Sequence, residues 1–408
     1  NLRCFESPMN VEEGGAAPAP KPEARGDRKL NLQSVSMNSF AQNPPYILKL
    51  STNYRPGASQ AMVASASSDK TVKLHALDVQ GGKMSYLSEL KGHMKPITSL
   101  GFVPEQPKLL FTSSLDGTLA FWDTTTGKAA TTVNAPNKPA LHSADCASKI
   151  AAAGTETDVF LWDLRSGKGL SHLPEYHTED VTALKFHPNS DAALFSAGGD
   201  GFINQYDLKQ TDEDEILEAA INTEQPVTSF GFFGHKSEYM YAFSTMEEMS
   251  LYDVETAMPV VKFPDVRERL SKAARTGINY LVDCHYNPKN NRLFLCSGTT
   301  SGGFLVTHVS KNNLQPMVAL YDHAAHTDVI RDFLWLDDIE AIITAGEDSK
   351  ICIWGPAKPK EDAAMNFKAV SQGKAVTKSM SRKSPYDSSS RRAARREKSS
   401  GADYKSRK

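Results

Sequence analysis

Short apolar runs separated by turn residues recur along most of this chain. In one of them Val181 and Ala183 alternate with Thr182, Lys185-Phe186 follow, and residues 193–196 form a second run before a turn at residues 198–201. Alternation with a period of two is typical of a half-buried β-strand, and a turn that contains Asp and Gly is typical of a β-hairpin. The pattern therefore predicts an all-β chain of short strands that pair in sequence order.

One segment departs from this alternation. Val266, Leu270, Ala274 and Ile278 recur every four residues after Pro264, so we expect a short amphipathic helix there. Two interpretations stay open for it. Either its charged residues (Arg267, Glu268, Arg269 and Lys272) face a partner protein, or the helix is a connection whose apolar stripe packs on the sheets.

Three of the strand units carry the same four kinds of side chain at nearly the same spacing. Counted from the His, the side chains stand at offsets 0, 19, 23 and 29 in the first two sets. In the third set the offsets are 0, 18, 22 and 28. The sets are His93, Thr112, Asp116 and Trp122; His177, Ser196, Asp200 and Tyr206; and His326, Thr344, Asp348 and Trp354. Such side chains can form one hydrogen-bonded network. We call them tetrads and expect them to clamp a loop onto a four-stranded sheet, which is a structural role.

The ends of the units can be counted along the chain. Steps between the aromatic endings are 40, 44 and 46 residues from Trp122 to Tyr252. The endings are Leu77-Asp78, Trp122-Asp123, Trp162-Asp163, Tyr206-Asp207, Tyr252-Asp253, a degenerate one near His308, and Trp354. Repeats of this length are typical of β-propeller blades. The sequence therefore predicts a seven-bladed β-propeller over residues 31–356.

Three of the predicted blades lack parts of the tetrad. The third has Ala152 where the hydroxyl is expected, the fifth has Glu247 and Glu248 in place of Asp-Gly, and the sixth lacks both His and Trp. We expect these blades to depend on packing against their neighbours.

Closure of the ring needs a further strand. The inner strand of the last blade is expected to end at Trp354, because Pro356 and Pro359 cannot donate to a ladder. An open edge of this kind invites aggregation. We therefore expect residues 31–40 to pair there as an N-terminal strand, with residues 1–30 and residues 357–408 disordered on either side.

The repeat motifs resemble those of WD-repeat proteins. They comprise Gly92-His93, residues 113–117 (SSLDG), residues 121–123 (FWD) and residues 161–164 (LWDL). Within that group the chain is similar to the WD-repeat-containing protein 89 family. This similarity covers residues 177–188 (HTEDVTALKFHP), residues 153–156 (AGTE), residues 265–268 (DVRE) with Tyr280-Leu281, and residues 345–348 (AGED) with Trp354. The resemblance implies a WD-repeat adaptor without specifying its partners.

Charge is distributed unevenly between the ring and the C-terminal tail. Residues 358–408 hold 15 Lys and Arg against five Asp and Glu, a net charge of +10, whereas the whole chain carries −2. The rest therefore sums to −12 and includes an acidic run at residues 212–215. The basic clusters of the tail are Arg382, Lys383, Arg391, Arg392, Arg395, Arg396 and Lys398. Clustered cations are typical of nuclear-import and phosphate-binding segments. A solvated tail that keeps the protein soluble is the alternative.

Motifs of catalysis, cofactor binding and membrane insertion are absent from the sequence. It holds no nucleophile elbow, phosphate-binding glycine loop or zinc-protease pattern. Its five cysteines form no paired motif and are expected to be reduced thiols of an intracellular protein. We expect no enzyme activity, no cofactor and no membrane-spanning segment.

The resulting functional hypothesis is a scaffold that binds other proteins through the loops and faces of the ring. We expect a monomeric ring within a larger complex, in the nucleus or nucleolus and also the cytoplasm, with RNA as a second partner of the basic tail. The specific hypothesis is that this scaffold takes part in ribosome or ribonucleoprotein assembly.

A different class of function stays open beside it. Residues 162–165 (WDLR) match the WDxR pattern of propellers that act as substrate receptors of cullin-RING ubiquitin ligases, and Arg165 would contact the ligase adaptor.

Overall fold

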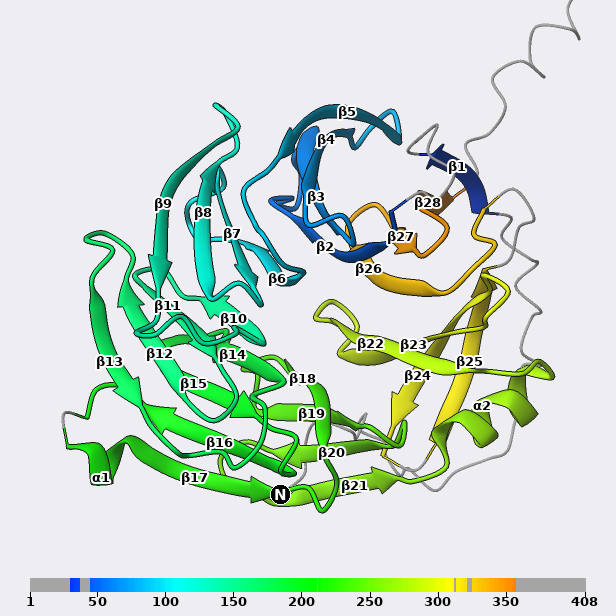
Figure 1. The fold of residues 1–408 in the computed structure, drawn as a ribbon. Helices are drawn as coiled ribbons and strands as arrows, with labels where there is room; N and C mark the ends of the chain where they lie inside the picture. The colour runs from blue at the N-terminus through cyan, green and yellow to red at the C-terminus, as the bar shows by residue number, and fades with distance from the viewer. Residues whose placement is uncertain (1–29, 37–44, 211, 312, 321–324, 357–408) are drawn as a thin grey trace, which may run out of the picture. The chain divides into compact units, whose positions relative to one another are not determined.

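The computed structural model describes residues 30–36, 45–210, 212–311, 313–320 and 325–356. In this part the chain forms seven four-stranded antiparallel sheets arranged as a ring (Figure 1). The predicted seven-bladed β-propeller is therefore confirmed. The flanks predicted to be disordered lie outside the described residues except for Leu30 at the start of β1.

Each blade consists of four strands that are consecutive in the chain, apart from the last blade. Blade 1 comprises β2 (Ile47–Thr52), β3 (Gln60–Ser67), β4 (Val72–Asp78) and β5 (Lys83–Leu90). Blade 2 comprises β6 (Ile97–Phe102), β7 (Leu109–Ser114), β8 (Thr118–Asp123) and β9 (Lys128–Asn134). Blade 3 comprises β10 (Ser143–Cys146), β11 (Ile150–Gly154), β12 (Val159–Asp163) and β13 (Gly169–Leu173). Blade 4 comprises β14 (Ala183–His187), β15 (Ser190–Ala197), β16 (Phe202–Asp207) and β17 (Leu217–Asn222).

The second half of the ring repeats this arrangement. Blade 5 comprises β18 (Val227–Phe233), β19 (Tyr239–Ser244), β20 (Met249–Asp253) and β21 (Pro259–Phe263). Blade 6 comprises β22 (Tyr280–Asn287), β23 (Arg292–Gly298), β24 (Phe304–Ser310) and β25 (Asn313–Leu320). Blade 7 comprises β26 (Ile330–Leu336), β27 (Ala341–Gly346), β28 (Lys350–Pro356) and the N-terminal β1 (Leu30–Ser36).

The first strand of each blade lies at the centre of the ring. These seven inner strands contact one another in sequence, and β26 contacts β2, so the ring is closed (Figure 1). Trp354 was expected at the end of the inner strand of the last blade, which is wrong. It lies in β28, the third strand from the centre, as Trp122 lies in β8 of blade 2.

The N-terminal strand covers the free edge of the last blade. β1 pairs antiparallel with β28, from Leu30 opposite Pro356 to Ser36 opposite Lys350. The pairing therefore extends two residues beyond Trp354, since Pro356 stands at the strand end where a missing N–H costs little. Residues 37–40 of the expected strand lie outside the described residues.

The hydrophobic core is divided among the boundaries between blades. Seven clusters of buried apolar side chains occur in the described part, and each joins two neighbouring blades. A cluster that contains Ile47 and Ile351 joins the last blade to the first. Each sheet is thus buried on both faces only when its two neighbours are present, which makes the ring one cooperative array.

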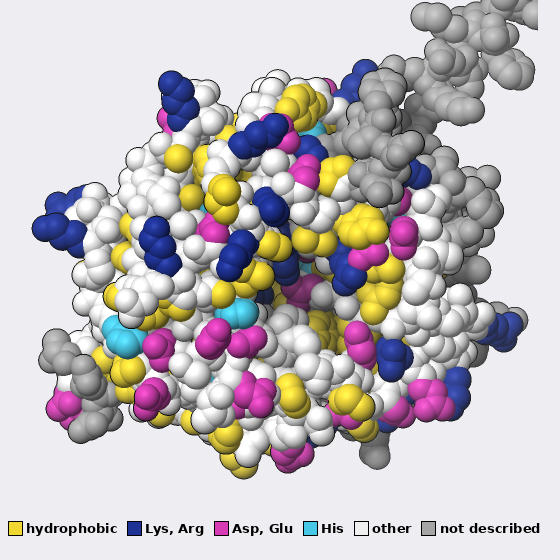
Figure 2. Space-filling model, in the orientation of Figure 1, with side chains coloured by type: hydrophobic (Ala, Val, Ile, Leu, Met, Phe, Trp, Pro, Cys, Tyr) yellow, Lys and Arg dark blue, Asp and Glu magenta, His cyan; other side chains and the backbone are white. Residues whose placement is uncertain are grey.

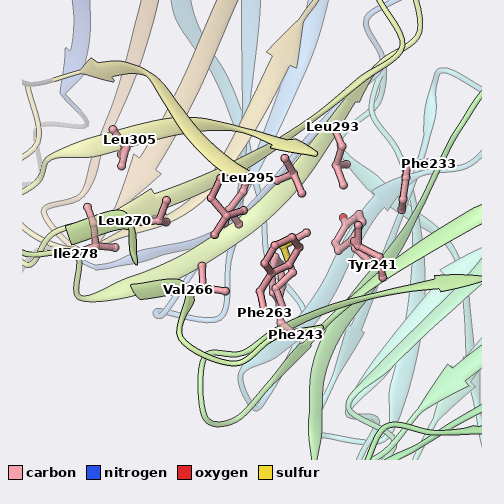
Figure 3. Close-up of a cluster of buried hydrophobic side chains, with 14 of the residues drawn as sticks. Phe233, Tyr241, Phe243, Phe263, Val266, Leu270, Ile278, Leu293, Leu295 and Leu305 are labelled. Atoms are coloured by element: carbon pink, nitrogen blue, oxygen red, sulfur yellow. The ribbon is translucent and has the colours of Figure 1, made fainter. Parts of the chain in front are cut away.

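The predicted helix after blade 5 is confirmed as α2 (Val266–Ala274). Its buried residues Val266 and Leu270 enter the cluster between blades 5 and 6, next to Leu295 of β23 (Figure 3). On its exposed side Lys272 pairs with Glu268, and Arg269 pairs with Asp265. The apolar stripe thus packs on the sheets, as the second interpretation of this segment stated.

The acidic run at residues 212–215 overlaps a single helical turn. α1 (Glu213–Ile216) follows β16, and its last residue, Ile216, is buried in the cluster between blades 3 and 4. Asp212 and Glu215 are exposed.

Candidate interaction surface

The first tetrad forms a continuous hydrogen-bond network in blade 2. His93 Nδ1 lies 3.2 Å from the Asp116 carboxylate, and His93 Nε2 lies 2.6 Å from Thr112 Oγ1. Trp122 donates its indole N–H to the same Thr112 oxygen at 2.8 Å. Because Nδ1–H donates to the carboxylate, Nε2 accepts from the threonine hydroxyl, so every member has a defined role.

The second and third tetrads repeat this geometry. In blade 4 His177 Nε2 lies 2.7 Å from Ser196 Oγ, which is 2.9 Å from the Tyr206 hydroxyl. His177 Nδ1 lies 3.0 Å from Asp200. The blade 7 members are His326, Thr344, Asp348 and Trp354, with distances of 2.9 Å from His326 Nε2 to Thr344 and 3.0 Å from Nδ1 to Asp348. The structure therefore brings each set together across three elements.

The blade 2 tetrad holds a neutral imidazole beside an ionised carboxylate, since the pKa values of both His93 and Asp116 are lowered. Burial lowers the pKa of His93 and His177, and this outweighs the neighbouring carboxylates, which favour the charged ring. Burial opposes ionisation of Asp348, but its hydrogen bond to His326 and its backbone donors outweigh that effect and lower its pKa. The network is saturated with partners inside the fold, which favours a structural clamp over catalysis.

Blade 1 carries part of a tetrad that the sequence analysis missed. Ser65, Asp69 and His75 have the same 0, 4 and 10 spacing as Thr112, Asp116 and Trp122 of blade 2. Strand pairing agrees, since Val63 lies opposite His75 as Leu110 lies opposite Trp122. The position expected at Leu77 is therefore occupied by His75. The six-residue spacing from Asp69 to His75, which equals that from Asp116 to Trp122, is the sequence signal that could have predicted this.

His75 is buried without a well-formed hydrogen bond to the described residues. Burial lowers its pKa to about 4, although the nearby Val63 carbonyl favours the charged ring. The ring packs edge-on against Tyr86 at 5.9 Å between centroids. A histidine in this position behaves as an apolar filler at neutral pH.

Inner-strand aspartates join neighbouring blades. Asp332 of β26 accepts the backbone N–H of Leu50 in β2 at 2.7 Å, across the closure of the ring. Asp145 of β10 accepts the N–H of Phe186 in β14 at 2.8 Å. Burial raises the pKa of both carboxyls to about 6. These residues were not predicted from the sequence. A single acidic residue within an apolar inner strand is the pattern that could have indicated them.

The incomplete blades also use links between neighbours. Glu247, which stands in the turn of blade 5, accepts the backbone N–H of Leu281 in blade 6 at 2.7 Å. Ala152 lies opposite Leu161 in blade 3, with no hydroxyl at this position. These blades depend on the inter-blade clusters, together with such single bonds.

A cavity lies at the centre of the ring. Its volume is about 320 Å³, and its charged lining residues come from four blades: Lys49, Glu247, Asp283, Arg331 and Asp332. Arg331 pairs with Glu347 at the surface, and Asp332 binds Leu50 as described above. Glu247 and Asp283 likewise bond across the boundary between blades 5 and 6, whereas the Arg331–Glu347 pair lies within blade 7, so three of these five charged residues join neighbouring blades.

Loops on the face of the ring that carries the tetrads expose apolar side chains. Met94 follows His93 directly and is 76% exposed, and Met246 in the β19–β20 turn is 64% exposed. Tyr46 and Phe202 are also exposed beside the corresponding loops of blades 1 and 4. Loops that precede an inner strand and turns between the second and third strands lie on one face of a propeller. Met258 lies in a β20–β21 loop, on the opposite face, and is 63% exposed.

Blades 3 to 5 are far more acidic than blades 1 and 2. Residues 142–263, which form blades 3 to 5, hold 21 Asp and Glu against seven Lys and Arg, whereas residues 45–141 hold six against ten. Figure 2 shows the result on one face, where Lys and Arg gather over β2–β9, and Asp and Glu over β12–β21.

Arg165 lies in the turn between β12 and β13 and is exposed. Asp163 accepts the Ser166 N–H at 2.7 Å and orders this turn. The Arg165 side chain makes no ion pair with the described residues. The basic tail, from Arg382 to Lys398, lies outside the described part of the chain.

The described residues hold no metal centre, disulfide or membrane-spanning helix. Among the described residues, no group of three His, Cys, Asp or Glu side chains could hold a metal ion. None of the four cysteines in that part forms a disulfide. Neither described helix has the length and hydrophobicity needed to cross a bilayer.

Comparison with known proteins identifies the repeat. The family model for the WD domain, G-beta repeat, matches residues 84–123 and 170–207. A β subunit of a guanine nucleotide-binding protein from Zea mays is 30% identical over 36% of this chain and 41% of its own. WD-repeat propellers are generally non-catalytic modules of protein–protein interaction.

Two relatives match over most of their length. A WD repeat-containing protein 89 homolog from Dictyostelium discoideum is 32% identical over 78% of this chain and 85% of its own. WD repeat-containing protein GTS1 from Arabidopsis thaliana is 28% identical over 88% of this chain and 92% of its own. The chain therefore belongs to the WD repeat-containing protein 89 family of WD-repeat proteins.

Proposed function

We propose that this chain is a non-catalytic scaffold that binds partner proteins through the loop face beside its tetrads. The observation that carries the proposal is the exposure of Met94 and Met246 on loops of a rigid ring. Binding residues concentrate on loops that a rigid scaffold positions, and the flexible thioether of Met adapts to different partners. The tetrads and inner-strand aspartates supply the rigidity.

A double variant, Met94→Glu with Met246→Glu, tests this surface. Affinity purification of the tagged full chain, followed by mass spectrometry, is expected to lose the specific partners of the wild type. Met258→Glu, on the opposite face, is the matched control and should keep them. Identical partner sets for both variants would contradict the proposal.

The basic tail extends this role to the nucleus. We assign residues 358–408 to import and to RNA contact, in support of ribosome or ribonucleoprotein assembly, because their net charge of +10 favours binding to phosphate. Removing residues 358–408 is expected to abolish nuclear or nucleolar location and RNA association. Unchanged location and RNA recovery would remove this part of the proposal.

A second candidate function is that of a substrate receptor of a cullin-RING ubiquitin ligase. Arg165 favours it, since this side chain is exposed on an ordered turn and is available for charge-assisted hydrogen bonds. Co-purification of the ligase adaptor should be lost on Arg165→Ala and kept on Lys168→Ala in the same turn. Absence of the adaptor from wild-type samples would exclude this candidate.

A further inference from the structure

A groove separates blades 2 and 3 on the outer side of the ring. Its volume is about 790 Å³, within the size range of ligand sites and larger than one side chain needs. One wall is the β9–β10 loop, and the other consists of β12 and β13. The lining residues on which the proposal rests are Ala135, Pro136, Asp158, Phe160, Leu170 and His172.

Aromatic rings form the floor of this groove. Phe160 and His172 stack at 4.4 Å between centroids with an interplanar angle of 7°, and Trp162 lies 6.2 Å from Phe160. His172 is fixed by a 3.0 Å hydrogen bond to Asp158. Leu170 stands beside these rings and is 53% exposed. Phe160 and Trp162 belong to the buried core between blades 2 and 3, so the surface that the groove opens to solvent consists chiefly of Leu170 and the His172 ring.

The opposite wall is held in place before any ligand binds. Lys138 N–H donates to the Ala135 carbonyl at 3.1 Å, and Leu141 N–H donates to the Ser114 carbonyl at 3.3 Å. Gly117, at φ +80°, packs against this loop so closely that a Cβ would lie 2.7 Å from the Lys138 oxygen. A preformed wall reduces the entropy lost on binding.

The groove is acidic at one end. Asp158 belongs to its lining, and burial opposes its ionisation, but the Glu175 N–H and His172 outweigh that effect and keep its pKa below the usual value. Glu156 and Glu175 are exposed next to it. Blades 3 to 5, which begin at this groove, carry a net charge of −14. Negative charge of this kind repels phosphate and attracts Lys and Arg.

We propose that this groove binds an extended segment of a partner protein, with an apolar side chain against Phe160 and Leu170 and a basic side chain at Asp158. The inference deepens the scaffold function and rests on it, because it states the chemistry of one partner sequence. The exposed Leu170 favours an apolar peptide side chain over RNA, and Asp158 with its acidic neighbours favours a positive charge on that peptide.

A phage-displayed library of random 12-residue peptides, selected on the purified full chain, tests the proposal. Enriched sequences should combine apolar with Lys or Arg residues. Leu170→Glu should weaken the selected peptides at least tenfold, as expected from about 1.5–3 kcal/mol for burying a Leu-sized side chain. Val318→Glu is the matched control, since Val318 is 44% exposed on β25, the outer strand of blade 6.

A charge variant separates the two halves of the site. Asp158→Asn should weaken peptides that contain Arg, and should leave their Arg→Ala versions unaffected. Failure to enrich any peptide, equal binding to Leu170→Glu, or displacement of the peptide by poly(U) RNA would overturn the inference. These outcomes differ from failure of the scaffold function, in which the wild type has no specific protein partner at all.

Discussion

Replacing Asp200 with alanine should destabilise the ring through one buried donor. His177 is 1% exposed, and its Nδ1 lies 3.0 Å from Asp200. Asp200 also accepts the backbone N–H groups of Thr178 and Phe202, but both stand in exposed surroundings, where water can replace it. The cost is therefore that of one unsatisfied buried donor, about 1–3 kcal/mol. For about 300 ordered residues this corresponds to a fall in Tm of about 2–5 °C.

Thermal and guanidinium unfolding of the full chain at pH 7.4 would measure this effect. Asp200→Asn is expected to lose less stability, because its amide oxygen can still accept from His177. Asp191→Ala is the matched control, since Asp191 lies in the same blade on β15 and is exposed. If Asp200→Ala is no less stable than Asp191→Ala, the blade-four tetrad is not the clamp inferred from its geometry.

Three further variants test other parts of the ring. Between pH 7 and pH 4 the wild type should lose about 3 kcal/mol of stability through His75, because the unfolded residue binds a proton near pH 6.5 and the folded one only near pH 4. His75→Leu should remove this loss. An unchanged pH profile in urea unfolding would contradict the prediction. Asp332→Asn tests the effect of a raised pKa. The folded carboxyl of Asp332 titrates near pH 6, above its unfolded value, so its contribution to the stability of the wild type falls as pH rises from 4 to 6. Over that window the stability of the variant should therefore rise by up to about 3 kcal/mol relative to wild type. A variant that gains nothing between these pH values would show that the charge of Asp332 is not desolvated. Leu270→Ala should cost about 2–5 kcal/mol, since this side chain is fully buried between blades 5 and 6, and a loss below 1 kcal/mol would show that α2 does not contribute to that core.

Local patterns were sufficient to predict much of the fold. The alternation of apolar residues, the repeated tetrads and the spacing of the unit endings led to seven blades, because each depends on residues within one repeat. The spacing of Val266 and Leu270 likewise predicted α2. The assignment of Trp354 to an inner strand was wrong. The apolar pattern of a strand predicts that the strand is buried, but not which place it takes in its sheet.

Contacts between repeats could not be predicted in the same way. Asp332 bonds with Leu50, which is 282 residues away, and no local pattern relates the two. The groove likewise combines the β9–β10 loop of one blade with β12 and β13 of the next. Its acidic end depends on which side chains converge there.

The sequence by itself determined the repeating unit, the three complete tetrads and the contrast in charge between ring and tail, because all of these follow from residue identity and short spacing. Only the tertiary structure decided which hydrogen bonds join neighbouring blades, that His75 occupies an aromatic position, and which apolar side chains remain uncovered. The physical reason is that burial and hydrogen bonding between blades depend on distances across the ring, and these are set when all seven sheets pack together.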